Sequence, residues 1–135
     1  MAENIRLEVV TPEQAVIDEE AQIVVAPGSL GEFGVLIGHT PFLTALKVGS
    51  IYYKDANGNE RYIFVSGGFA EALPDKVTVL VESAEKRRDI DAERAKNAME
   101  RATERLDKED ENIDYVRAQA ALERAVYRLK LSEAK

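Results

Sequence analysis

The chain has 135 residues, 45% of them hydrophobic and 32% charged, which suits one ordinary domain, or a small domain with an appendage. It contains no cysteine, which excludes disulfides, thiolate zinc sites and cysteine nucleophiles. A formal net charge of -7 argues against nonspecific nucleic-acid binding, because phosphate contacts need clustered lysine and arginine side chains. The N-terminus lacks the pattern of a signal peptide, and no apolar stretch approaches the roughly 20 residues that span a bilayer. We therefore expect any membrane association to go through a partner.

The composition changes sharply along the chain. All eight glycines and all four prolines lie before Asp75. The residues up to Ala84 include 5 basic and 12 acidic side chains, whereas the rest of the chain has 13 of each. We therefore expect two parts, residues 1–85 and residues 86–135, joined without a flexible Gly/Ser linker.

The first part has the pattern of short β-strands. Residues 5–9 alternate between apolar and polar side chains, which is the period of two of a half-buried strand. Two aromatic, β-branched segments flank Asn57 and Gly58, a dipeptide suited to the positive φ angles of a tight hairpin turn. Other short apolar runs also end in turn residues. Many short antiparallel strands predict a small β-sandwich or flattened barrel.

The second part has the pattern of two helices joined by a polar turn. Asp89 or Asp91 can cap the first helix, and Asn112 or Asp114 the second. Each helix carries a stripe of small apolar residues at helical spacing: Ala95, Ala98, Ala102 and Leu106 in the first, and Ala118, Ala121, Ala125 and Leu129 in the second. Matching alanine stripes predict an antiparallel helical hairpin whose axes approach to about 8 Å. Because alanine buries little area, we expect such a hairpin to open at small cost.

The glycine-rich stretch GEFGVLIGHTPFLTALKVGS, residues 31–50, contains the only histidine, His39. It lacks the Gly-Lys-Ser/Thr ending of a phosphate-binding loop, and it does not have the spacing of a dinucleotide-binding loop. His39 has no second histidine for a metal and no Ser/Asp set for a triad, so a structural or interface histidine is favoured. We predict no catalytic residues and no metal site, and expect that the chain is not an enzyme by itself.

Four arginines of the helical part share helix faces in pairs. Arg94 and Arg101 are seven residues apart, and Arg124 and Arg128 are four apart. If the hairpin turns near residues 110–111, the four guanidinium groups converge, and guanidinium forks match phosphate oxygens well. The alternative is pairing with glutamates of the same helices, which would contribute little at an exposed surface. Spacing alone favours this second interpretation.

The segments LEVVTPEQAV, GEFGVLIGHTPFLTALKVG, VSGGFAEALPDKVTVLVESAE, DIDAERAKNAMERA and RAQAALERAVYRL occur here in this order. Through them the chain resembles the epsilon subunit of bacterial F-type ATP synthases along essentially its whole length. The resemblance implies an α+β fold, with an N-terminal β-sandwich of about ten strands and a C-terminal helical hairpin. It also implies a non-catalytic rotor subunit of the central stalk. This subunit would couple the catalytic head to the membrane c-ring of a proton-translocating synthase, and its helices would inhibit ATP hydrolysis.

The resemblance further implies partners and contact residues. The sandwich would bind the gamma subunit and the c-subunit ring, and the hairpin would reach the alpha and beta subunits when extended. The residues implied at the c-ring and gamma interface are Glu32, Phe33, His39 and Phe42. The protein would lie on the cytoplasmic side of a bacterial cell membrane as a peripheral component of the complex.

Some members of the family bind ATP on the folded hairpin through an Ile/Leu-Asp-x-x-Arg-Ala segment and further arginines. IDAERA, residues 90–95, fits that segment, which raises the arginine interpretation above its alternative. The implied nucleotide-binding residues are Glu85, Ile90, Asp91, Arg94, Arg101, Arg124 and Arg128. ATP would then be a regulatory ligand, and no cofactor is required. Two other hypotheses remain at this point: a free-standing nucleotide-sensing module and an adaptor with a coiled-coil tail.

Overall fold

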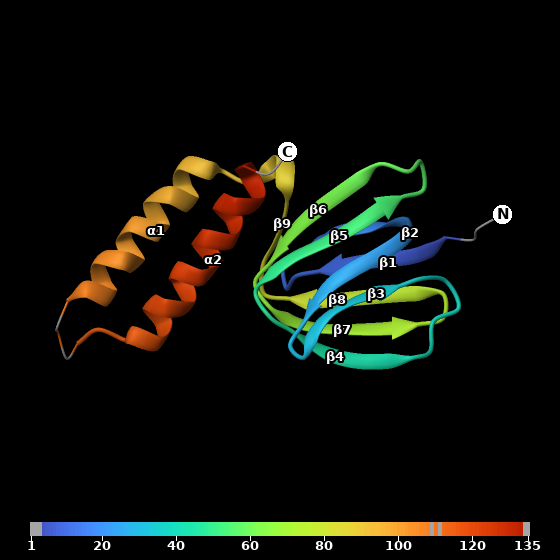
Figure 1. Cartoon of the computed structure of the whole chain (residues 1–135), viewed down its shortest axis with the longest axis horizontal. Coiled ribbons are helices and arrows are strands. Elements are labelled where there is room, and N and C mark those ends of the chain that lie inside the picture. Colours follow the sequence, from blue (N-terminus) through green and yellow to red (C-terminus); the bar gives the residue numbers. More distant parts are fainter. Residues whose placement is uncertain (1–3, 109, 111, 134–135) are drawn as a thin grey trace. The chain divides into compact units, whose positions relative to one another are not determined.

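The computed structural model describes residues 4–108, 110 and 112–133. The chain divides into two compact units, one ending at Arg87 and the other beginning at Arg88. The first unit contains strands and the second contains helices (Figure 1). The change in composition near residue 85 therefore accompanies a change in secondary structure.

Nine strands form one sheet among the described residues. They are β1 (Ile5–Val10), β2 (Ala15–Gly28), β3 (Gly31–Val35), β4 (Phe42–Leu46), β5 (Gly49–Asp55), β6 (Glu60–Val65), β7 (Gly68–Leu73), β8 (Lys76–Val81) and β9 (Ala84–Lys86). The strand order is β1-β8-β7-β4-β2-β5-β6-β9, β3 pairs with β2, and β1 also pairs with β2. The pairing of β1 with both β8 and β2 closes the sheet on itself, which confirms the sandwich or flattened barrel.

The strand count differs slightly from the expected ten because β2 is one strand of 14 residues. Residues 15–21 of β2 pair with β1, and residues 21–25 pair with β5 after a register shift between Ala21 and Ile23. Counting β2 as two strands at this irregularity would give ten. The sheet is also mixed, since β1 and β8 run parallel. That pairing joins the first strand to one near the end of the unit, and no local pattern indicates it.

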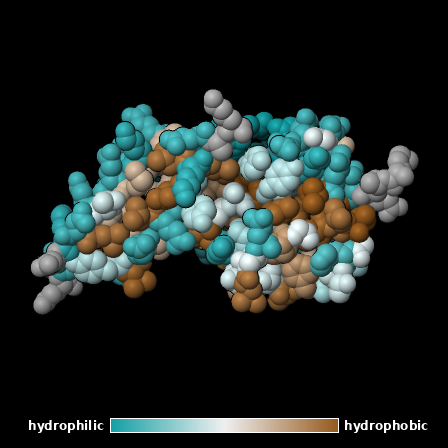
Figure 2. All heavy atoms as spheres, in the orientation of Figure 1, coloured by the Kyte–Doolittle hydropathy of each residue, from teal (hydrophilic) through white to brown (hydrophobic). Residues whose placement is uncertain are grey.

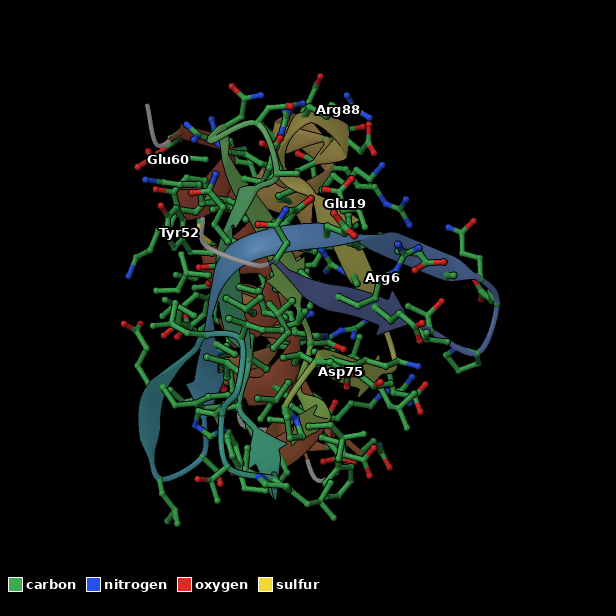
Figure 3. All side chains as sticks on the ribbon, turned by 90° about the vertical axis from the view of Figure 1, so that its right-hand side faces the viewer. Arg6, Glu19, Tyr52, Glu60, Asp75 and Arg88 are labelled. Atoms are coloured by element: carbon green, nitrogen blue, oxygen red, sulfur yellow. The ribbon has the colours of Figure 1, made fainter. Side chains whose placement is uncertain are left out.

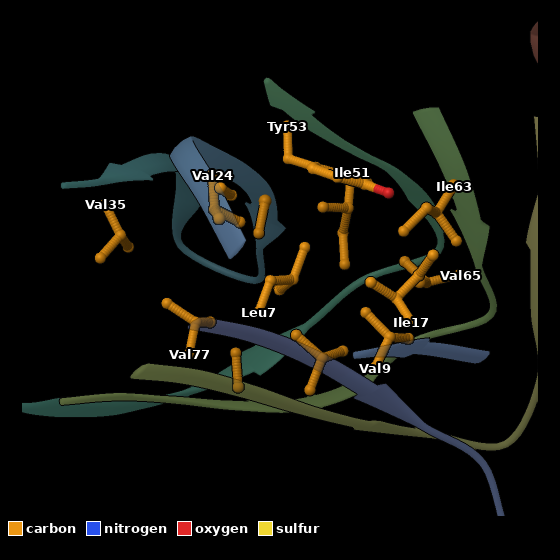
Figure 4. Packing of buried hydrophobic residues seen from close by; sticks show 14 of the residues in the cluster. Leu7, Val9, Ile17, Val24, Val35, Ile51, Tyr53, Ile63, Val65 and Val77 are labelled. Atoms are coloured by element: carbon orange, nitrogen blue, oxygen red, sulfur yellow. The ribbon is translucent and has the colours of Figure 1, made fainter. Parts of the chain in front are cut away.

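The buried core arises because side chains along each strand alternate between the inner and outer faces of the sheet. Ile5, Leu7 and Val9 of β1 are fully buried, whereas Arg6 between them is exposed. The pairing of β1 with β8 places Leu7 opposite Val77. Figure 4 shows these apolar side chains meeting those of other strands in one cluster. The alternation predicted for residues 5–9 is confirmed.

The hairpin between β5 and β6 is also confirmed, with a different turn from the one expected. Among the described residues, positive φ angles occur only at glycines, so Gly58 has one (+84°) and Asn57 does not. Asp55 instead organises a wider turn: its carbonyl oxygen accepts a hydrogen bond from Gly58 N, and its carboxylate accepts from Asn57 N and Asn59 N. The Asp55 side chain thus makes hydrogen bonds within the turn that a two-residue turn would make between backbone atoms.

The second unit contains α1 (Ala92–Asp107) and α2 (Tyr115–Glu133), which run antiparallel side by side (Figure 1). A 3-10 turn, Arg87–Asp89, precedes α1. Asp91 is the N-cap of α1, since its Oδ1 accepts from Arg94 N at 3.0 Å. Asp114 caps α2 in the same way through Arg117 N at 3.0 Å. Each helix therefore begins at one of its two candidate caps.

The alanine stripes lie between the two helices, as predicted, although not every member is buried. Ala95, Ala102, Ala118 and Ala125 are buried, while Ala98, Leu106, Ala121 and Leu129 keep partial exposure. The connecting turn is held by the Tyr115 hydroxyl, which donates to Lys108 O and accepts from Asp110 N. Of the two residues where the turn was expected, Asp110 lies in it, and Glu111 lies outside the described residues.

We predict that a chain ending after Arg87 folds by itself. Every member of the hydrophobic cluster lies between Ile5 and Val81, so the fragment keeps the whole core. The cut must follow β9, because Ala84, Glu85 and Lys86 pair with β6. The fragment should unfold in one cooperative thermal transition, and a chain ending at Ala84 should melt lower. A fragment ending at Arg87 that shows no cooperative transition would contradict the division into two units.

We also predict that Tyr53 makes the sandwich sensitive to alkali. Tyr53 is 2% exposed, and its hydroxyl donates a hydrogen bond to Glu19. Burial raises the pKa of Tyr53 far above the usual value, and the hydrogen bond to Glu19 and the Glu19 charge raise it further. A raised folded-state pKa gives stability that is complete below about pH 10 and is lost as the pH rises toward the folded value. Denaturant unfolding of Tyr53→Phe should vary less between pH 10 and 12 than that of the wild type. The control Tyr52→Phe, at a more exposed position, should change this slope less, and equal slopes for all three proteins would refute the prediction.

Candidate docking surface and nucleotide site

An aromatic cluster holds the glycine-rich loop between β3 and β4. The Phe33 and Phe42 rings meet edge to face, with centroids 5.1 Å apart and planes at 85°. The His39 ring lies 4.8 Å from Phe42. Both phenylalanines also pack against the core. Three of the four predicted interface residues therefore form one cluster, while the fourth, Glu32, is exposed on β3.

The His39 ring also has a polar neighbour in this loop. Its Nδ1 lies against Thr40 O, which can accept a hydrogen bond from that nitrogen. The loop itself is fixed by Gly38 N, which donates to Pro74 O in the β7–β8 turn at 2.6 Å, and by His39 N, which donates to Leu36 O. His39 thus has a packing role, which agrees with the structural or interface interpretation.

The outer face of the sheet carries a row of apolar side chains that sequence reasoning missed. Phe69 of β7 pairs directly with Ala45 of β4 and with Leu80 of β8, and Leu80 pairs with Val10 of β1. Phe69 is 57% exposed and Leu80 is 55% exposed. We call Val10, Ala45, Phe69 and Leu80 the outer apolar row. Figure 2 shows hydrophobic side chains gathered on the sandwich, including a group at its lower edge where β4 runs.

Two further leucines extend the apolar surface beside this row. Leu43 of β4 is 70% exposed and lies two residues from Ala45 on the same strand face. Leu30, at the tip between β2 and β3, is fully exposed, and its neighbour Ser29 donates from its backbone N to Ala45 O. The tip is tight, because a Cβ on Gly28 would come within 2.6 Å of Gly31 O. The tight tip therefore presents an exposed leucine one residue from Ser29, which hydrogen-bonds to the backbone of Ala45.

The predicted nucleotide-binding residues fall on both sides of the division between the units. Glu85 pairs with Phe64 in the sheet of the first unit, and Ile90 lies just before α1. Asp91 is already engaged as the N-cap of α1. The arginines are divided between the helices: Arg94 and Arg101 are exposed on α1, and Arg124 and Arg128 are half-buried on α2. Convergence of the four guanidinium groups on one ligand stays a prediction.

The sandwich also has an acidic hollow of about 330 Å³. Its lining residues are Arg6, Asp18, Glu19, Glu20, Asp55, Ala56 and Asn57. Arg6 is its only basic side chain, and its guanidinium lies 2.6 Å from Asp18 Oδ1. Figure 3 shows Arg6 on β1 and Glu19 on the neighbouring strand β2. Hydrogen bonds to the carboxylate, chiefly from Asn59 N and Arg61, hold the pKa of Asp55 below its usual value.

The described part of the chain has neither a metal-binding cluster nor a membrane-spanning helix. No group of three histidine, aspartate or glutamate residues there is placed to hold a metal ion. No described helix has the length and apolar character needed to cross a membrane.

Comparison with known proteins identifies the family. Residues 4–87 match the family described as ATP synthase, Delta/Epsilon chain, beta-sandwich domain, and residues 88–133 match its long alpha-helix domain. The chain belongs to the ATP synthase delta/epsilon family. The family resemblance proposed from sequence is thus confirmed, and the two matches meet where the structure divides the chain.

Relatives of the family are similar over most or all of their length. The ATP synthase epsilon chain of Desulforapulum autotrophicum is 62% identical over 135 residues, covering 100% of both chains. That of Desulfosudis oleivorans is 64% identical over 107 residues, covering 79% of this chain and 80% of the relative. Among solved structures, a chain of the Euglena gracilis mitochondrial ATP synthase (OSCP/F1/c-ring) matches with a TM-score of 0.77 and 25% identity, over 89% of this chain and 76% of that one. A chain of the Tetrahymena thermophila mitochondrial ATP synthase central stalk/c-ring matches in fold alone, with a TM-score of 0.55 and 12% identity over 97% and 95% of the chains.

Proposed function

We propose that this protein is a non-catalytic rotor subunit of the central stalk of a proton-translocating F-type ATP synthase. The observation that carries the proposal is the outer apolar row, together with Leu43 and Leu30. Large apolar side chains that stay exposed side by side mark a surface that another protein covers. A chain similar to this one belongs to a solved assembly of OSCP, F1 and a c-ring, which supports a place in such a complex.

In this proposal the sandwich docks and the hairpin regulates. Gamma covers the outer apolar row, and Glu32 and the loop around His39 face the c-ring. The hairpin, whose seam buries little beyond alanines, opens and extends toward the alpha and beta subunits, where it inhibits ATP hydrolysis. The protein would then be attached to the cytoplasmic face of a bacterial membrane through the complex. A free-standing sensor would leave the outer apolar row exposed to water.

A second function, ATP sensing, is favoured by the division of the arginines between α1 and α2. A ligand held by both pairs can bind only while the helices lie together, so it would stabilise the closed hairpin. The stabilisation is RT ln(1 + [L]/Kd), or about 1.4 kcal/mol at ten times Kd. When ATP is scarce the hairpin would open and inhibit hydrolysis.

The ATPase activity of the assembled motor tests the proposed function as a whole. Motors rebuilt with the full chain should hydrolyse ATP more slowly than motors rebuilt with a chain ending after Arg87, and both should synthesise ATP. Equal hydrolysis by the two motors would remove the inhibitory role of the hairpin. Failure of the full chain to join a gamma–c-ring assembly would remove the rotor role.

The docking surface predicts a loss of affinity without a loss of stability. Phe69→Ser with Leu80→Ser should weaken binding to the gamma–c-ring assembly at least about tenfold, because central apolar anchors each contribute more than about 1 kcal/mol. Glu32→Gln should weaken it less. The melting temperature of the isolated chain should stay nearly constant, since both apolar residues are more than half exposed. Val116→Ser, at a position 82% exposed on α2, is the matched control for a lost surface side chain. Unchanged affinity of the double variant would show that the outer apolar row is not part of the interface.

The sensing function predicts that the isolated wild-type chain binds ATP at millimolar concentration, with a binding heat and a rise in melting temperature. Arg124→Ala with Arg128→Ala should abolish both signals and also weaken the inhibition of hydrolysis. Arg105→Ala with Arg117→Ala removes the same charge from the hairpin outside the predicted set, and it should retain ATP binding. If calorimetry of the wild type gives no heat and no thermal shift, the sensing function is wrong.

A further inference from the structure

The tip of the β5–β6 hairpin contains a reactive dipeptide that the docking and regulatory roles do not use. Asn57 and Gly58 are both exposed there. An asparagine followed by glycine can deamidate, since no Cβ at the second residue hinders approach to the amide carbon. In this reaction the deprotonated Gly58 N bonds to Cγ of Asn57 and the side-chain nitrogen leaves as ammonia. Water then opens the cyclic imide at either carbonyl to give aspartate or isoaspartate.

The structure restrains the nitrogen that would have to attack. Gly58 N donates its hydrogen to Asp55 O at 3.0 Å, so the proton that must leave is engaged in a hydrogen bond. The backbone on either side is fixed as well: Asp55 Oδ1 accepts from Asn57 N at 3.0 Å and from Asn59 N at 2.9 Å. Asp55 N closes the turn to Asn59 O at 2.9 Å. Rotation of the Asn57 backbone toward the cyclic geometry would break several of these bonds together.

The Asp55 carboxylate is itself held in place. Its second oxygen, Oδ2, accepts from Arg61 Nε at 3.2 Å. The hydrogen bonds that lower the pKa of Asp55 keep this carboxylate ionised, and an ionised carboxylate is the stronger acceptor for the turn. The Asp55 carboxylate thus adds two hydrogen bonds to the two that the backbone of residue 55 makes within the tip.

We propose that Asn57 is a site of spontaneous deamidation, and that Asp55 restrains the reaction by holding the Asn57–Gly58 backbone in the turn. The inference is independent of the proposed rotor function. It makes the hairpin tip a position where the chain acquires a negative charge with age, at a rate set by the integrity of the turn.

The product would be unfavourable at this position. Asn57 lines the acidic hollow together with Asp18, Glu19, Glu20 and Asp55, where Arg6 is the only basic lining residue. A new carboxylate at residue 57 would be repelled by these groups. The isoaspartyl product also adds a methylene to the main chain, which disturbs the spacing of the Asp55 hydrogen bonds. We therefore expect aged chains to melt at a lower temperature than fresh ones.

The experiment measures the rate of mass gain at Asn57 by peptide mapping during incubation at pH 8.5. The proteins are the full-length wild type, Asp55→Ala and Arg61→Gln, and the unfolded reference is a synthetic peptide of residues 52–62. Because a hydrogen bond of this kind contributes roughly a two- to tenfold change in an equilibrium, the wild type should deamidate about that much more slowly than the peptide. Asp55→Ala loses the carboxylate contacts and keeps the two backbone hydrogen bonds of residue 55, so it should deamidate faster than the wild type and more slowly than the peptide. Arg61→Gln keeps the Oδ1 contacts and should remain near the wild type.

Asn59 lies in the same peptide and is followed by Glu60, so it serves as the internal control and should stay unmodified. Equal rates in wild type and Asp55→Ala would overturn the restraint by Asp55. If Asn57 deamidates no faster than Asn59 in the free peptide, Asn57 is not a deamidation site. A wild-type rate equal to or above that of the peptide would show that the turn gives no protection, and would also refute the proposal.

Discussion

The sandwich depends on the backbone pairing of β2, which hydrogen-bonds to β1, β3, β4 and β5. Buried backbone groups must find partners, and a strand of this length can supply them to both layers. The irregularity between Ala21 and Ile23 lets β2 leave β1 and pair with β5 without a chain break. Because β2 belongs to both layers, their inward side chains meet in one core, and fewer sheet edges are left open.

The two units are held together by different interactions. The sandwich buries branched and aromatic side chains, whereas the hairpin buries mainly alanines and relies on local hydrogen bonds at its ends and turn. The apolar area of the outer row lies outside both cores, so it contributes nothing to folding while it faces water. Polar residues at positions 69 and 80 would leave both cores unchanged, because the Phe69 and Leu80 side chains lie outside them.

Local features could be predicted from sequence, and non-local ones could not. The caps Asp91 and Asp114, the buried stripe in β1 and the β5–β6 hairpin follow from neighbouring residues. The outer apolar row was missed because side chains that alternate along β7 point to two faces of the sheet, and the alternation does not show which face is buried. Hydrophobicity would turn Phe69 inward, yet the small Ala70 and Ala72 are the buried residues there. The parallel partner of β1 and the turn role of Asp55 depend on pairing that only the folded chain defines.

The parallel pairing of β1 with β8 has a consequence for synthesis of the chain. Arg6 pairs with Lys76, so closing the sheet brings together strands about 70 residues apart. Pairing of such distant segments is slow compared with the formation of a hairpin or a helix. On the ribosome, β1 can meet β2 early, but its other edge stays open until β8 has emerged. The helices follow β8 in the chain and can form within themselves while the sheet is still closing. The unit that docks can thus close its sheet once β8 has emerged, and the segment that we assign to regulation leaves the ribosome after it.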